Sequence, residues 1–429
     1  MTTKGMFRAI MALAIPSVIA NITTPLLSMV DVAIMGHLGS AVYLAAIAVG
    51  GTMFNMLYWL LGFLRMGASG LTAQAYGRND RSEISATIWR ALLISTTAGL
   101  LFIIFQHPLC SLVLSVIDPD TATIGPAAEY FSICIWGAPA VLGMYVLNGW
   151  FLGMQSPKTQ MWIAILINVV NIAISTLLVF GLNMGLRGAA FGTLTAQWAG
   201  FAVGMTLCLR RRVEITPWNV ITKAEEIRKF FKVNSDIFLR TVCLVGVTMW
   251  FTRIGASQGA LMLAANAVLM QFFTLFSYFM DGFAFAAEAL CGRYHGENNR
   301  QALSKAVTVT LGCGALLATM FTLVYVIGGD ALIDLLSDSH DIRSQAHEYL
   351  WWVVSIPLMG FTAFAWDGVA IGVSGTRLML WSVVWASAVF FVVWWLAFPE
   401  MGNHGLWLAF VCYLLTRGVV FSLCRRRLI

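Results

Sequence analysis

A single carboxylate on an apolar segment is the feature of this sequence best suited to chemistry. Asn21, Thr24, Ser28 and Asp31 follow one another at spacings of three, four and three residues, which puts all four on one face of a helix. A carboxylate there suits proton coupling, because burial disfavours its charged form whereas cations or polar neighbours favour it. The alternative is a carboxylate held by polar neighbours for packing alone.

Two prolines lie on the same segment and predict where its helix can bend. Pro25 sits inside the polar stripe and Pro16 lies closer to the start. Pro25 has no N–H to donate to the Asn21 carbonyl, so the helix can kink there.

A second polar face is predicted further along the chain. Asn168, Asn171 and Ser175 follow three- and four-residue spacing within another apolar run. Amides inside membrane helices also join neighbouring helices, so this face alone fits a structural role equally well. Isolated polar residues in other apolar runs complete the candidate cavity: Tyr130, Asn148 and Thr193.

The remaining candidates are charged residues, and most lie in the second half of the chain. Asp281 and Glu288 are seven residues apart and share a helical face, Asp367 follows later, and Arg65 and Arg240 are available partners. Structural ion pairing and a coupling role both fit this set. We hypothesise that Arg65 pairs with Glu288 or Asp281 across the halves in an outward-open state. Pairing of Arg65 within its own half, or contact with cytoplasmic water, is the alternative.

Composition identifies the environment of these residues as a membrane. Apolar residues make up 59% of the 429 residues and charged residues 11%, against about 25% charged residues in soluble domains. Lipid must therefore cover most of the surface. The net charge of +6 comes from basic residues in short loops between apolar runs, which argues against a nucleic-acid partner. The eight cysteines lack metal-ligand spacing, so we expect free thiols, no metal and no cofactor.

The apolar runs predict an all-α integral membrane protein. They are too long for barrel strands, so each is expected to be a transmembrane helix. The twelve predicted spans are 10–34, 43–75, 84–106, 126–151, 159–181, 188–208, 236–254, 261–291, 303–328, 344–371, 378–398 and 404–424.

The distribution of basic residues predicts the orientation. Lys and Arg gather in the loops on the side of the N-terminus, whereas the loops on the other side are acidic. This bias predicts a multi-pass protein of the cell inner membrane with both termini in the cytoplasm. The basic segment 223–232 is an amphipathic helix that we expect to lie on the membrane surface.

The chain contains an internal repeat. Shifted by 219 residues, 36–81 aligns without a gap with 255–300, and thirteen positions are identical, including the loop pattern Gly77-x-Asn79-x-Arg81. Six spans return the chain to its starting side, so the repeats are parallel. We therefore predict an N-lobe at 1–208, a cytoplasmic linker at 209–235 and a C-lobe at 236–429, with substrate between the lobes or inside one of them.

The sequence resembles the multidrug and toxic compound extrusion (MATE) family, in its DNA-damage-inducible DinF-type branch. The resemblance covers essentially the whole chain. The motifs that carry it include Ala14-Ile15-Pro16 with Val30-Asp31, Gly36-His37-Leu38-Gly39, Gly70-Leu71-Thr72-Ala73-Gln74-Ala75-Tyr76-Gly77, Asp281-Gly282-Phe283-Ala284 and Asp367-Gly368.

The resemblance implies a V-shaped, two-lobed antiporter that exports amphipathic, often cationic drugs. It implies a coupling-ion site at Asp31, Asn171 and Thr193, with Tyr130 and Asn148 nearby. Some members have a second aspartate where this chain has Ser175. A sodium site built on two carboxylates is therefore in doubt, and we expect protons rather than Na⁺ to be the coupling ion. We expect a monomer surrounded by membrane lipid.

Two other functions compete with drug export. A flippase of the same superfamily, for a lipid-linked or lipid-like substrate, is the alternative; such proteins often carry fourteen helices or several Arg residues in a central cavity. Here only Arg65 and Arg240 are expected at depth. An intramembrane enzyme is disfavoured, because the sequence shows no Ser/Lys or metal-binding constellation.

Overall fold

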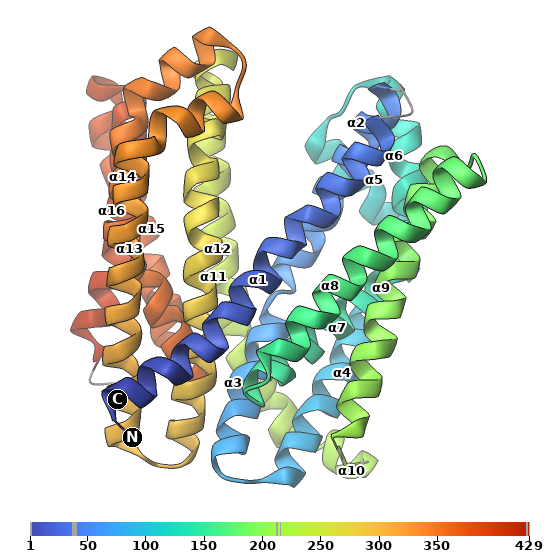
Figure 1. Ribbon diagram of the computed structural model, residues 1–429, viewed down its shortest axis with the longest axis vertical. Coiled ribbons are helices and arrows are strands. Elements are labelled where there is room, and N and C mark those ends of the chain that lie inside the picture. Colours follow the sequence, from blue (N-terminus) through green and yellow to red (C-terminus); the bar gives the residue numbers. More distant parts are fainter. Residues whose placement is uncertain (1, 37–40, 212, 215, 426–427, 429) are drawn as a thin grey trace. The chain divides into compact units, whose positions relative to one another are not determined.

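The protein is built from helices in the part of the chain that the structure describes. That structure is a computed structural model, and it describes residues 2–36, 41–211, 213–214, 216–425 and 428. The first half contains α1 (Thr3–Gly36), α2 (Ala41–Leu60), α3 (Phe63–Gly77), α4 (Arg81–Ile104), α5 (Gln106–Ile117), α6 (Thr121–Cys134), the 3-10 turn η1 (Ile135–Gly137), α7 (Ala138–Gly153), α8 (Pro157–Thr176), the π-helical segment η2 (Leu177–Gly181) and α9 (Gly185–Arg210). After α10 (Trp218–Ile221), the second half contains α11 (Ala224–Ser257), α12 (Ala260–Gly296), α13 (Arg300–Leu336), α14 (His340–Gly372), α15 (Thr376–Met401) and α16 (Asn403–Leu423) (Figure 1).

These helices confirm the predicted all-α membrane fold. Among the described residues, eleven helical stretches are long and apolar enough to cross a membrane. The twelfth predicted span, 188–208, corresponds to α9, which has 26 residues but many Gly, Ala and Thr residues. At 1.5 Å per residue, α9 is about 39 Å long, enough to cross the hydrocarbon core.

The helix boundaries repeat at the shift found in the sequence. The helical stretch from α6 to α7 covers residues 121–153, and α14 covers 340–372. The stretch from α4 to α5 covers 81–117, and α13 covers 300–336. Both pairs are related by a shift of 219 residues. The repeat is therefore present in the fold as well as in the sequence.

The loops between these helices repeat just as closely. Asn79 and Asn298 both have positive φ, 55° and 54°, as do Gln155 and Ser374, 55° and 57°. The residues that directly follow the two asparagines cap the next helix in both halves. Asp80 accepts from the Glu83 N–H, and Asn299 accepts from the Ala302 N–H, each at 3.0 Å. Asparagine tolerates the left-handed conformation better than most residues, which explains why the Gly-x-Asn-x-Arg pattern recurs.

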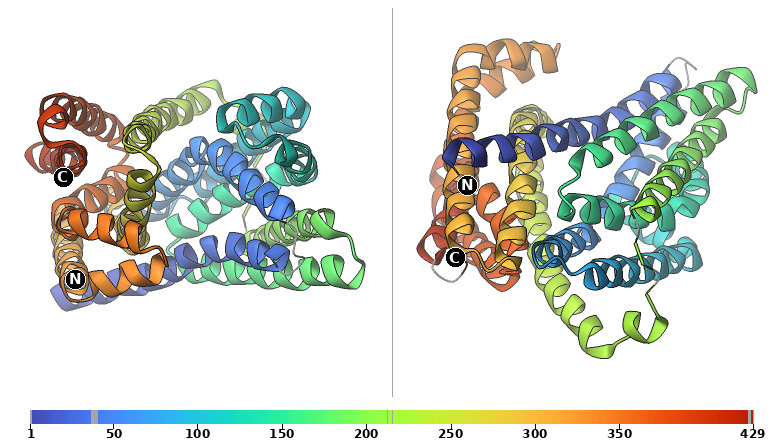
Figure 2. Two further views of the ribbon diagram at one scale, coloured as in Figure 1. Left: turned by 90° about the horizontal axis from the view of Figure 1, so that it is seen from above. Right: turned by 60° about the horizontal axis from the view of Figure 1, so that its bottom comes forward.

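Closely packed glycines form the same helix crossing in both halves. α3 packs on α7, and α12 packs on α14 (Figures 1 and 2). A Cβ on Gly153 would lie 2.7 Å from the Ser69 carbonyl oxygen, and one on Gly372 would lie 2.6 Å from the Glu288 carbonyl oxygen. Small residues let membrane helices approach to backbone contact. The crossing therefore depends on the absence of side chains at these two positions.

The halves differ in the continuity of their helices. In the first half the chain leaves regular α-helix at Leu61–Gly62, at Phe105, at η1 and at η2. The equivalent stretches of α12, α13, α14 and α15 are continuous. The predicted span 43–75 is thus two helices, α2 and α3, separated by a turn at Leu61–Gly62.

The structure divides into two compact units, which we call the N-unit and the C-unit. The N-unit is Ile19–Asn234, and the C-unit is Met1–Val18 with Ser235–Ile429. The N-unit core contains Trp150, whereas the C-unit core is strongly aromatic around Trp407. The predicted lobes differ from these units. They placed the first helix, 10–34, entirely in the N-lobe (1–208) and the span 236–254 entirely in the C-lobe (236–429).

The two divisions fall inside α1 and α11, which are equivalent helices in the repeat. The start of α1 packs in the C-unit, where a Cβ on Gly282 would lie 3.1 Å from the Val18 nitrogen. The start of α11 packs in the N-unit, where a Cβ on Gly67 would lie 2.8 Å from Asn234 Nδ2. Residues 224–232 are thus the first turns of the long helix α11, not a separate surface helix.

We expect Gly153→Val and Gly372→Val each to lower thermal stability, by about 1–3 kcal/mol for overpacking a close contact. Thermal unfolding of the purified protein in detergent measures the loss. The control is Gly312→Ala on α13, where an added Cβ meets nothing within 4 Å; it should leave stability unchanged or raise it slightly. Wild-type stability of the two valine variants would show that the crossing does not need glycine.

Candidate functional site

The structure brings Asp31, Asn171 and Thr193 together inside the N-unit. They come from α1, α8 and α9, and their exposed fractions are 4%, 0% and 6%. The Thr193 hydroxyl donates to Asp31 Oδ2 at 3.1 Å and accepts from Asn171 Nδ2 at 3.0 Å. One threonine therefore orients both the carboxylate and the amide.

The close approach of α8 and α9 makes this arrangement possible. Gly192 precedes Thr193, and a Cβ there would lie 2.8 Å from the Cα and N atoms of Ser175. Because Gly192 has no side chain, α9 can contact the α8 backbone and bring Thr193 within reach of Asn171. Asn171 and Ser175 are four residues apart and face α9 together, as the sequence spacing predicted.

Three oxygen atoms in this group have no hydrogen-bond partner among the described residues. They are Asp31 Oδ1, Asn171 Oδ1 and Ser175 Oγ, all buried. Most buried polar atoms in proteins are hydrogen-bonded, so unpaired oxygens beside a carboxylate are exceptional. They can be satisfied by a proton on the carboxylate, by water or by a bound cation.

Tyr130 and Cys134 of α6 complete the wall of the group. Tyr130 is buried, and its hydroxyl interacts with Thr193 and Cys134. The Cys134 thiol also donates to the Ala190 carbonyl at 3.6 Å. From the sequence we predicted only that Cys134 is a free thiol. Its four-residue spacing from Tyr130 is the signal that could have assigned it to this site.

The structure places the other residues predicted for the cavity on α1, α7 and α8. Asn168 Nδ2 donates to the Thr23 carbonyl at 3.2 Å and to the Ala164 carbonyl at 2.9 Å, so it links α8 to α1. Asn21 is half-buried on α1, and Asn148 lies on α7. The side chain of Ser28 and the loop residues His37 to Gly39 lie outside the described residues. Pro16 and Pro25 lie within α1, which is helical throughout.

The charged candidates of the C-unit form a buried ion-pair network. Asp367 accepts from Arg417 Nη2 at 2.6 Å and also binds Arg240 through the same carboxylate oxygen. Asp281 lies close enough to Arg417 to interact electrostatically, and Glu288 is fully buried. The sequence singled out only Arg65 and Arg240 among the arginines and missed Arg417, which is 4% exposed.

Arg65 belongs to the N-unit, not to the C-unit charged group. It is half-buried on α3 and lies near the Tyr145 side chain of α7. Its proposed pairing with Glu288 or Asp281 joins the two units and stays a prediction.

Known proteins resemble this chain in sequence and in fold. The MatE family profile matches residues 16–177 and 237–396, one stretch in each half. The chain is 35% identical to DNA damage-inducible protein F of Escherichia coli, over 98% of this chain and 92% of the relative. It is 24% identical to a probable multidrug resistance protein NorM of Bradyrhizobium diazoefficiens, over 93% of this chain and 88% of that one. The crystal structure of the Vibrio cholerae MATE transporter VcmN in the bent form superposes with a TM-score of 0.89 at 15% identity, covering 99% of this chain and 97% of that one.

We expect Thr193→Val to impair transport, because it removes the hydrogen bonds to Asp31 and Asn171 while nearly preserving side-chain shape. Loss of about 1–3 kcal/mol at a buried polar group should lower the drug efflux rate at least about fivefold. Thr193→Ser should restore efflux. The control is Thr195→Val on the same helix, whose hydroxyl donates only to the Phe191 carbonyl, at 2.7 Å. Unchanged efflux in Thr193→Val would remove Thr193 from the site.

Proposed function

Because the chain belongs to the MatE family of multi-pass membrane transporters, we propose that it is a cation-coupled antiporter. In this proposal it exports amphipathic, often cationic, drugs and toxic compounds across the cell inner membrane, with both termini in the cytoplasm. A relative named as a multidrug resistance protein supports the substrate class.

The observation that carries the proposal is the half-satisfied carboxylate of Asp31. Thr193 holds Oδ2, which stabilises the ionised form, whereas Oδ1 is buried without a partner. A buried carboxylate in this state gains from taking up one positive charge. Antiport requires that the coupling ion and the substrate favour different states of the protein, and a single carboxylate that gains and loses a charge can provide that difference.

We propose protons rather than Na⁺ as the coupling ion. One proton on Oδ1 would neutralise Asp31 and supply a donor where the structure has an unpaired acceptor at Asn171 Oδ1. A hard cation needs several oxygen ligands and favours more negative charge. Asp31, Asn171 and Thr193 offer three oxygen ligands for Na⁺, but Ser175 adds a neutral oxygen where a second carboxylate would add charge.

The ion pairs of the C-unit support drug export over a lipid-linked substrate. A flippase for pyrophosphate-linked lipids needs arginines directed to its cavity. Here Arg240 and Arg417 both bind Asp367, so their charge is partly neutralised within the protein.

We expect Asp31→Asn to abolish coupled export while expression and folding stay at wild-type levels. Asparagine keeps the shape and still accepts from Thr193, but it cannot gain and lose a charge. Drug resistance of cells carrying the variant should fall to that of cells without the transporter. The matched control is Asp120→Asn, the same change at an exposed position, which should keep full resistance. Full resistance in Asp31→Asn would exclude Asp31 as the coupling residue.

Imposed gradients across proteoliposomes test the coupling ion directly. A pH gradient at equal Na⁺ concentrations should drive drug transport, and a Na⁺ gradient at constant pH should not. Transport that follows the Na⁺ gradient and is absent under the pH gradient would establish sodium coupling instead. The comparison does not require the natural substrate, because the same drug is used under both gradients.

A further inference from the structure

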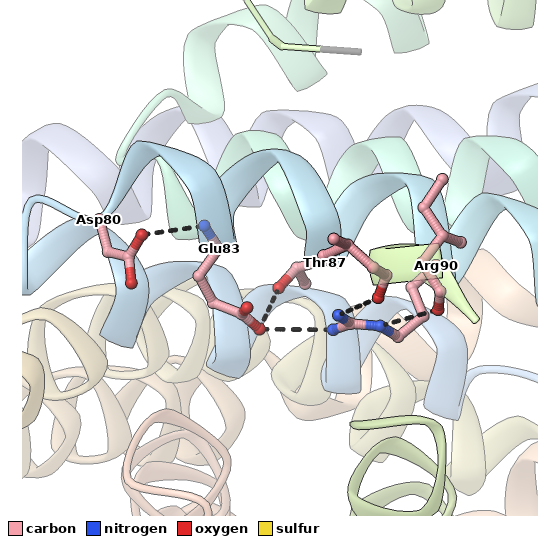
Figure 3. A network of polar contacts seen from close by, with 6 residues as sticks. Asp80, Glu83, Thr87 and Arg90 are labelled. Carbon is pink, nitrogen blue, oxygen red and sulfur yellow. Dashed lines mark hydrogen bonds and ion pairs between the residues drawn. The ribbon is translucent and has the colours of Figure 1, made fainter. Parts of the chain in front are cut away.

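The segment 211–223, which we call the linker, lies between α9 and α11, and its described residues are bound to the N-unit. The buried Arg90 of α4 donates from Nε to the Ile221 carbonyl and from Nη2 to the Val220 carbonyl, both at 3.4 Å. Glu83 holds the same guanidinium through Nη1 at 3.3 Å and also accepts from Thr87 (Figure 3). α4 therefore anchors the end of the linker.

A second set of contacts anchors the beginning of the linker. Trp89 Nε1 donates to the Glu214 carbonyl at 3.0 Å, and the Glu214 N–H donates to Ser85 Oγ at 3.1 Å. Both ends of the linker are thus held on α4, and the linker becomes part of the surface of the N-unit.

The folded linker encloses a pocket of about 390 Å³ against the helices. Its walls come from the α3–α4 turn, α4, the end of α7 and the linker, and its lining includes Tyr76, Asn79, Arg81, Ser85, Trp150 and Arg211. Trp150 and Ser85 are buried, whereas Asn79, Arg81 and Arg211 are exposed. The pocket therefore has a buried, partly aromatic floor below an exposed, cationic rim.

The rim arginine from the linker is held in place by neutral groups. Arg211 Nη2 donates to Ser156 Oγ at 2.6 Å and to Thr159 Oγ1 at 3.0 Å, and its guanidinium lies 5.4 Å from the centre of the Phe151 ring. These contacts orient the group without neutralising its charge. On the floor, the buried Trp150 Nε1–H has no partner among the described residues.

The nearby carboxylates do not neutralise this rim. Asp80 caps α4, and Glu83 binds Arg90. Glu214 is exposed and does not line the pocket. Two arginines and an asparagine line this pocket. Side chains of these types favour an anion that accepts several hydrogen bonds, and phosphate is a group that arginine binds well in this way.

We propose that this pocket binds the phosphate group of an anionic membrane phospholipid. The pocket volume lies in the range of about 300–1,000 Å³ typical of small-molecule sites, so there is room for more than the phosphate. Tyr76, Trp150 and Met154 provide apolar surface for the glycerol and the first methylenes of the acyl chains.

The segment after the pocket points to a membrane lipid as the source of the phosphate. Trp218 and Phe231 are 66% and 52% exposed, and Lys223 and Arg228 are exposed beside them. Exposed aromatic and basic side chains together are typical of segments at the lipid headgroup level. A lipid bound here would fasten the linker to the α3–α4 turn and to the end of α7.

Lipid binding to the purified transporter tests the proposal without a transport assay. Native mass spectrometry would measure retention of phosphatidylglycerol and phosphatidylcholine by the wild type, Arg81→Gln and Arg211→Gln. The matched control is Arg300→Gln, the repeat equivalent of Arg81 in the C-unit, which does not line this pocket. Inorganic phosphate and glycerol 1-phosphate, added as competitors, separate a lipid from a free anion.

We expect the wild type and Arg300→Gln to retain phosphatidylglycerol in preference to phosphatidylcholine. Arg81→Gln and Arg211→Gln should each weaken that binding by about tenfold, since each removes a charge-assisted contact. Millimolar phosphate should not displace the lipid. Equal phosphatidylglycerol retention in all four proteins would overturn the proposal. Displacement by inorganic phosphate, with no preference between the two lipids, would overturn the lipid as the source. Neither result bears on Asp31, so the proposed export function is tested separately.

Discussion

A carboxylate buried among lipid-covered helices must be paired, hydrogen-bonded or protonated, and the two units meet this constraint in different ways. In the C-unit, Asp367 lies between Arg240 and Arg417, so its negative charge is compensated inside the protein. In the N-unit, the hydrogen-bond partner of Asp31 among the described residues is the neutral side chain of Thr193. Both carboxylates have one buried oxygen without a hydrogen-bond partner among the described residues. Two cations already compensate Asp367, so it has little reason to bind another positive charge, whereas Asp31 with its neutral partner does. This difference makes Asp31, rather than Asp367, the centre of the proposed coupling.

The repeat accounts for the helix crossings and turns that the two halves share. The breaks in the helices of the first half account for a difference between the halves. Gly153 and Gly372 form the same crossing, and the turns at Asn79 and Asn298 have the same backbone conformation. Among the described residues, the membrane helices are interrupted only in the first half, and two of the four interruptions lie next to the site. η1 directly follows Cys134, and η2 begins two residues after Ser175. Interrupted helices at binding sites are a common feature of transporters built from repeats.

The connection between the units is also set by backbone packing. α1 and α11 each begin in one unit and end in the other, because Gly282 and Gly67 allow their first turns to pack closely there. Two long helices, rather than a flexible loop, therefore join the units. The linker that follows α9 is bound to α4 through Arg90 and belongs to one unit only.

The sequence by itself determined the elements, the repeat and the residue to examine first. Hydrophobic runs of more than about 20 residues have one stable form in lipid, the helix, and a lone carboxylate such as Asp31 is costly enough there to indicate function. Only the tertiary structure determined which side chains these residues contact. Thr193 reaches Asn171 because Gly192 lets α9 contact α8, and Arg417, which the sequence did not single out, is buried in an ion pair with Asp367. The linker pocket likewise depends on contacts more than 100 residues apart in the chain, such as that of Arg90 with Ile221. Hydropathy is local along the chain, whereas pairing depends on which helices approach each other and how closely, and periodicity does not contain that information.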